Sequence, residues 1–222
     1  MGTPDFAVGS LQALCESGKH EILAVVTQPD RPKGRGNKLL QTPVKEYALA
    51  QGLTVYQPQK VKTPEFVELL HELQPELIVV AAFGQFLSKE ILELPKYGCI
   101  NVHASLLPKY RGAAPIQYAI IKGEKESGVT IMQMDIGMDT GAMLDKVVVP
   151  IAENTTMGEL HDALREQGAA LLLEVIDKIA AGTAVAEPQD NEQATYATLL
   201  DRSMEHIDWS KTAQEVHNLI RG

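Results

Sequence analysis

Short apolar runs alternate along the chain with stretches in which apolar residues recur every three or four positions. The runs predict buried strands, and the periodic stretches predict amphipathic helices. We expect strands at 21–28, 54–56, 76–82, 99–103, 128–134 and 142–149. We expect helices at 5–17, 43–50, 64–74, 113–122 and 157–181. This alternation predicts an α/β fold, with a mainly parallel twisted sheet covered by helices on both faces.

The composition adds few constraints. A chain of 222 residues with 45% hydrophobic content can bury one sizeable core. Its apolar runs are shorter than the roughly 18 residues that span a membrane. Cys15 and Cys99 lie in apolar segments and form neither a metal-ligand spacing nor a disulfide framework, and the histidines are scattered. We therefore expect a cytoplasmic protein that does not associate with membranes and holds no metal.

Three polar residues, two on a predicted strand and one in a later loop, are candidates for a catalytic role. Asn101 and His103 lie two positions apart, so they share one strand face just before a loop that contains Pro108. Asp139 stands in a later loop of small residues. An amide, an imidazole and a carboxylate can stabilise an oxyanion, move a proton and orient the ring in acyl transfer. Taken alone, the Asn-x-His pair is more simply explained as a turn former and a core histidine bonded to the backbone.

A resemblance decides between these interpretations. Residues 101–116 (NVHASLLPKYRGAAPI) resemble the signature of formyltransferases that use 10-formyltetrahydrofolate. Residues 1–7, 27–36 and 128–135 are similar to segments of the methionyl-tRNA formyltransferases, and nearly the whole chain can be laid along their catalytic domain. The resemblance implies a Rossmann-like, formyltransferase-type fold and an enzyme of one-carbon group transfer.

The same resemblance implies a domain organisation. Residues 1–200 would form the catalytic domain, in which the family's first strand is missing because the chain starts next to Gly2. Residues 201–222 would form a helical linker toward a C-terminal β-barrel domain that this chain lacks.

The resemblance also implies roles for residues. Asn101, His103 and Asp139 would be catalytic, with Asp139 and a bound water assisting proton removal and keeping the ring charged. The pterin of the folate would lie between the loop of residues 136–139 and the loop that contains Phe83, Gln85, Phe86 and Leu87. The side near the formyl group would be lined by Ser105, Leu106, Leu107 and Pro108. Without the resemblance, the apolar members of this set are more simply explained as core.

The charge of the chain favours a nucleic-acid partner in one short stretch only. The net charge of −9 disfavours binding to phosphate as a whole. However, Arg31, Lys33, Arg35 and Lys38 fall in one Pro- and Gly-rich stretch without acidic residues. The resemblance implies that this stretch contacts the initiator methionyl-tRNA, and we expect Arg111 to extend the basic, tRNA-binding surface near the active site. The alternative is a solvated surface loop.

Other acceptors of the formyl group remain open. A sugar-nucleotide formyltransferase or a 10-formyltetrahydrofolate hydrolase can use the same three residues, and a non-enzymatic folate- or RNA-binding module is a third alternative. Asp5 would place a carboxylate at a helix N-terminus, which disfavours the phosphate of a phosphorylated small amine. Phe6 beside it offers apolar surface for a methionyl side chain. We expect a methionyl-tRNA enzyme that acts as a monomer.

Overall fold

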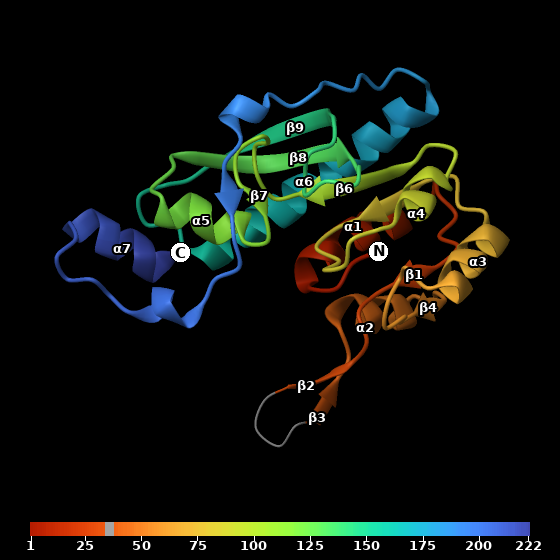
Figure 1. The fold of residues 1–222 in the computed structure, drawn as a ribbon, viewed down its shortest axis with the longest axis horizontal. Coiled ribbons are helices and arrows are strands. Elements are labelled where there is room, and N and C mark those ends of the chain that lie inside the picture. Colours follow the sequence, from red (N-terminus) through yellow and green to blue (C-terminus); the bar gives the residue numbers. More distant parts are fainter. Residues whose placement is uncertain (34–37) are drawn as a thin grey trace.

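Helices and strands alternate along most of the chain in the computed structural model, which describes residues 1–33 and 38–222 (Figure 1). The helices are α1 (Asp5–Ser17), α2 (Pro43–Ala50), α3 (Pro64–Leu73), α4 (Lys89–Glu93), α5 (Pro115–Ile121), α6 (Met157–Ala180) and α7 (Ala213–Arg221), with the short 3-10 helices η1 (Asn191–Gln193) and η2 (Arg202–Glu205). The strands are β1 (Val25–Val26), β2 (Arg31–Lys33), β3 (Lys38–Leu40), β4 (Val55–Tyr56), β5 (Ile78–Val80), β6 (Cys99–His103), β7 (Arg111–Gly112), β8 (Glu126–Gln133), β9 (Met143–Pro150) and β10 (Tyr196–Ala197).

The central sheet has the order β5-β6-β8-β9. β5 and β6 are parallel, whereas β8 runs antiparallel to both β6 and β9. A second parallel pair joins β1 to β4, and a third joins β7 to β10. The predicted α/β class is confirmed. The antiparallel direction of β8 and β9 is a feature that apolar runs alone do not reveal.

Helices cover the central sheet on two faces, each with its own core. On one face, β6 residues Ile100 and Val102 pack with side chains of α1, α2, α5 and α6. On the other face, β5 residues Ile78 and Val80 pack with side chains of α3 and α4. Gly168 lets α6 approach the sheet closely, since a Cβ there would lie 3.1 Å from a Val129 methyl.

Local signals explain why several elements begin and end where predicted. α1 ends at Gly18, whose φ of 60° is the left-handed conformation that terminates helices. α2 starts at Pro43 after Thr42, whose hydroxyl accepts a hydrogen bond from the Lys45 amide. The long α6 begins with a capping box between Thr156 and Glu159. These three boundaries were predicted to within one residue.

The first two residues bridge β1 and β5. Gly2 donates its amide to the Val26 carbonyl at 2.9 Å, and the Ala81 amide donates to the Met1 carbonyl at 3.0 Å. A cavity of about 590 Å³ lies beside this bridge, between Ala24 of the β1 side and Leu77 of the β5 side.

The segment predicted as a linker lies against the rest of the chain. Helix α7 packs beside α5, and Asn218 on α7 is buried. Arg221 donates to the Thr155 carbonyl at 2.6 Å. Among the described residues, no helix is both long and apolar enough to cross a membrane.

Candidate active site

Strand β6 positions the first two candidate residues. Asn101 and His103 alternate with Ile100 and Val102, which are buried in one core, so the two polar side chains point to the opposite face. Both are largely buried, with 9% of Asn101 and 5% of His103 exposed. Flanking strands β5 and β8 hold β6 by backbone pairing on both sides. The pair is therefore set on a rigid element at the end of a central strand.

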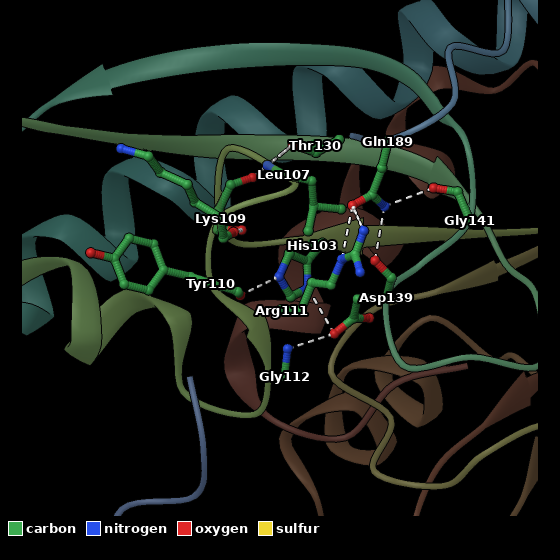
Figure 2. Close-up of polar contacts among 11 residues, drawn as sticks. His103, Leu107, Lys109, Tyr110, Arg111, Gly112, Thr130, Asp139, Gly141 and Gln189 are labelled. Carbon is green, nitrogen blue, oxygen red and sulfur yellow. Dashed lines mark hydrogen bonds and ion pairs between the residues drawn. The ribbon is translucent and has the colours of Figure 1, made fainter. Parts of the chain in front are cut away.

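The ring of His103 is oriented by two neighbours. Nε2 lies 2.9 Å from the backbone carbonyl oxygen of Tyr110, and Nδ1 lies 3.7 Å from Oδ2 of Asp139 (Figure 2). A carbonyl can only accept a hydrogen bond, so Nε2 must carry a hydrogen. Protonation of the ring then places a second hydrogen on Nδ1, toward the carboxylate.

Asp139 is brought to His103 by an unusual backbone conformation. Its φ of 55° lies in the left-handed region, which aspartate tolerates better than most residues. Its Oδ2 also accepts a hydrogen bond of 2.8 Å from the Gly112 amide. Gly112 has a φ of 112°, and a Cβ there would lie 2.6 Å from the Ala197 carbonyl oxygen, so this approach requires glycine.

The amide of Asn101 is available to a ligand. No hydrogen bond joins its side chain to another residue among those that the structure describes. The unpaired atoms of this amide are not fully buried, so they are accessible to a ligand beside the imidazole. The predicted grouping of Asn101, His103 and Asp139 has a geometry suited to acyl transfer.

The loop after β6 is fixed by internal bonds. The Ser105 hydroxyl donates to the Lys109 carbonyl at 2.6 Å, and Thr130 bridges the Ser105 carbonyl and the Leu107 amide. Ser105 and Leu107 are buried. Their side chains therefore shape the loop, and of the four residues predicted on this side Leu106 and Pro108 are the more accessible.

The other predicted folate loop divides in the same way. Phe83 and Leu87 are 2% and 6% exposed and belong to the core, so their side chains do not face a ligand. Phe86, in contrast, is 62% exposed. The side-chain oxygen of Gln85 accepts a hydrogen bond of 3.0 Å from the Val61 amide. A folate contact at Phe83 or Leu87 would therefore involve the backbone of these residues.

The basic stretch forms the arms of a hairpin. β2 and β3 pair in antiparallel fashion and project from the body of the molecule (Figure 1). Arg31 is exposed on β2, Lys33 and Lys38 end the paired strands, and Arg35 lies outside the described residues. At the base of the hairpin, the Asp30 carboxylate forms an ion pair of 2.6 Å with Lys45 Nζ. The bond to Lys45, with a second from Gln57, holds the pKa of Asp30 below its usual value.

The prediction that Arg111 contacts tRNA does not fit its position. Arg111 is only 2% exposed, and its guanidinium donates to Gln189 and to Asn191. Sequence reasoning also missed Gln189, because no local motif links a residue of the late chain to the Asp139 loop. Tyr110, next to Arg111, bonds Glu124 at 2.6 Å, and burial together with that bond raises the pKa of its hydroxyl.

Comparisons with known proteins identify the family of this chain. The formyl transferase family pattern matches residues 1–176. Methionyl-tRNA formyltransferase of Acetivibrio thermocellus is 55% identical over 222 residues, which cover all of this chain and 71% of that protein. The chain belongs to the methionyl-tRNA formyltransferase family. The enzyme of that name from Clostridium novyi is 56% identical over the whole of this chain and 72% of its own.

Solved formyltransferases share the fold of this family member. An N-formyltransferase from Helicobacter canadensis, solved with folinic acid and dTDP-3-aminofucose, superimposes with a TM-score of 0.73 at 28% identity. The match covers 99% of this chain and 77% of that one. The methionyl-tRNA formyltransferase relatives are about twice as similar in sequence, which favours them over sugar formyltransferases as the guide to function.

Proposed function

We propose that this chain transfers the formyl group of 10-formyltetrahydrofolate to the α-amine of methionyl-tRNA, producing N-formylmethionyl-tRNA for translation initiation. The observation that carries the proposal is the grouping of a free Asn101 amide with His103 and Asp139 at the end of β6. Identity above 50% across the whole chain with methionyl-tRNA formyltransferases supports the acceptor.

In the proposed reaction, the amine nitrogen attacks the formyl carbon and a new C–N bond forms. The carbonyl oxygen gains negative charge, and the Asn101 amide donates a hydrogen bond to it. An oxyanion is stabilised most by donors that are already in place, and β6 holds Asn101 rigidly. The bond from the formyl carbon to N10 of the folate then breaks.

His103 and Asp139 manage charge and the proton. The Nε2 hydrogen of His103 is committed to the Tyr110 carbonyl, so Nδ1 is the ring nitrogen available on the Asp139 side. In the charged ring, the Nδ1 hydrogen is donated to the oxyanion as it forms, and the Asp139 carboxylate at 3.7 Å stabilises the positive charge of the ring. Asp139, acting through a water, accepts the proton lost by the amine, and the departing N10 takes up a proton as tetrahydrofolate leaves. The reaction requires neither a covalent enzyme intermediate nor a metal.

The acceptor would be held by surfaces around this site. We propose that Arg31, Lys33, Arg35 and Lys38 of the β2–β3 region meet tRNA phosphates. Exposed Phe86, with Gln85 and the backbone of the same loop, would contact the folate together with Leu106 and Pro108. We propose further that the protein works as a monomer in the cytoplasm and that its acceptor is the initiator methionyl-tRNA.

One experiment separates this reaction from its closest alternatives. The purified chain would be mixed with labelled 10-formyltetrahydrofolate and either methionyl-tRNA, a dTDP-amino sugar or no acceptor. Formyl-methionyl-tRNA formed only with methionyl-tRNA is the expected result. Formyl sugar would indicate a sugar-nucleotide formyltransferase, and formate released at the same rate in all three mixtures would indicate a hydrolase.

A further inference from the structure

The side-chain amide of Gln189 connects the Asp139 loop to Arg111. Its Nε2 donates to the carbonyl oxygens of Asp139 at 2.8 Å and Gly141 at 2.7 Å. Its Oε1 accepts from Nε and Nη2 of Arg111 at 3.0 and 2.8 Å. Figure 2 shows the Gln189 amide between the Arg111 guanidinium and these loop carbonyls. All the hydrogen-bonding atoms of this amide are engaged.

Arg111 determines which way the amide points. A guanidinium has only donors, so the atom of Gln189 that faces it must be oxygen. The NH₂ group is then directed at the two loop carbonyls, and the reverse orientation would set oxygen against oxygen. Because Arg111 is itself buried and held by Asn191, the amide has one stable orientation.

The Asp139 loop needs such support. Asp139 adopts a left-handed backbone conformation, and its carboxylate faces both Nδ1 of His103 and the Gly112 amide. A change in the Asp139 backbone would rotate the carboxylate away from both partners. Gln189 forms hydrogen bonds with the backbone carbonyls on either side of Thr140, and so restrains the backbone of Asp139 in its left-handed conformation.

We propose that Gln189 is a positioning residue for Asp139, with Arg111 orienting the Gln189 amide. The inference rests on the proposed function, since it assigns the effect of Gln189 to the catalytic carboxylate. Among the residues that the structure describes, the Gln189 side chain forms hydrogen bonds with the loop backbone and with Arg111, so it acts on the reaction through the placement of Asp139.

The substitution Gln189→Glu separates the role of Gln189 in positioning Asp139 from its role in pairing with the buried Arg111 guanidinium. The glutamate keeps an oxygen for the Arg111 guanidinium, so the buried charge stays paired, but a second oxygen replaces the NH₂ group that faces the loop carbonyls. We expect kcat to fall by roughly tenfold or more while KM for 10-formyltetrahydrofolate stays within about threefold, because misplacing one reacting group mainly slows chemistry. Unchanged kcat in this variant would overturn the proposal.

Asn191→Asp is the matched control. It adds the same negative charge beside Arg111, and Asn191 makes no hydrogen bond to the Asp139 loop in the described structure. We expect its kcat to remain near the wild-type value. An equal fall in both variants would assign the effect to charge next to Arg111 and would contradict a positioning role.

Hydrogen exchange at the Gly112 amide provides a readout that does not depend on turnover. This amide donates to Asp139 Oδ2, so its exchange rate reports whether the carboxylate is in place. NMR should show exchange about tenfold faster in Gln189→Glu, with Asn191→Asp unchanged. Equal protection in all three proteins would overturn the inference. A wild-type chain that formylates no acceptor would contradict the proposed function, while this exchange test would still decide the role of Gln189.

Discussion

His103 Nε2 lies 2.9 Å from the Tyr110 carbonyl oxygen, and this contact determines how the ring takes part in chemistry. Tyr110 itself has a φ of 58°, so the loop directs its carbonyl back to the strand that carries His103. One ring nitrogen is thereby held by the backbone, and the other faces Asp139 at 3.7 Å. The ring cannot turn freely, and its reactive side is defined by the loop that follows β6.

Asn101 provides a test of oxyanion stabilisation. Asn101→Asp keeps the shape of the side chain but replaces the NH₂ donor with an oxygen that repels the developing charge. We expect kcat to fall by about 10²- to 10³-fold, as when a single oxyanion donor is lost. Steady-state kinetics would check this, with exposed Asn154→Asp as a control. Wild-type kcat in Asn101→Asp would remove Asn101 from the mechanism.

The basic hairpin should govern affinity for the tRNA and leave the folate untouched. Replacing Arg31 or Lys33 by alanine should raise KM for methionyl-tRNA without changing KM for 10-formyltetrahydrofolate. Each lost phosphate contact should also flatten the dependence of log KM on log salt by about one. Lys96→Ala removes an exposed charge that precedes β6, at the opposite end of the strand from the site. If Lys96→Ala raised KM for methionyl-tRNA to a similar extent, the effect would come from the overall charge of the protein and not from a binding surface on the hairpin.

Asp30 should make stability depend on pH in acid. Lys45 and Gln57 hold its pKa below the usual value, so the folded state favours the carboxylate. The stabilisation is complete above the unfolded pKa of about 3.9 and is lost as pH falls through the lower folded value. The Tm difference between wild type and Asp30→Asn should therefore be constant from neutral pH down to about 5 and shrink below about 4. A difference that persists undiminished at pH 3 would contradict this anchor. Glu93→Gln, at an exposed pair, is the control.

The two cysteines should differ in reactivity. Burial raises the pKa of the Cys99 thiol to about 12, and Cys99 is 3% exposed. Cys15 is partly exposed, and burial raises its pKa as well. A thiol reagent at pH 8 should modify Cys15 slowly and Cys99 only after unfolding, because the thiolate is the reactive form. In Cys15→Ser, fast modification of the folded protein would show that Cys99 is accessible.

Much of the fold could be predicted because local chemistry marks it. α1, α2 and β6 have the predicted bounds, since proline and glycine limit the helices and β6 is a continuous buried run. The strands β2 and β3 were not predicted in this Pro- and Gly-rich stretch, because the three-residue segments Arg-Pro-Lys and Lys-Leu-Leu are too short to show an alternation of apolar and polar positions. α4 is too short for a periodic signal.

The site was partly visible for a similar reason. Asn101 and His103 share a strand face, which spacing alone predicts. The burial of Arg111, Phe83 and Leu87 depends on how distant segments pack, and composition made Arg111 resemble a surface cation. The bond from Gln189 to Asp139 joins loops far apart in the sequence, so only the folded structure reveals it.

The most direct test of the account is the single-turnover rate of formyl transfer to methionyl-tRNA in His103→Asn and Asp139→Asn. Tetrahydrofolate binding would be measured on the same proteins, and His71→Asn on α3 would serve as a control. The account predicts that both site variants lose about 10²-fold or more of the rate, in the range for an acid–base group, while they bind folate like the wild type and His71→Asn keeps its rate. A rate close to wild type in either site variant would contradict the central claim that His103 and Asp139 carry the reaction.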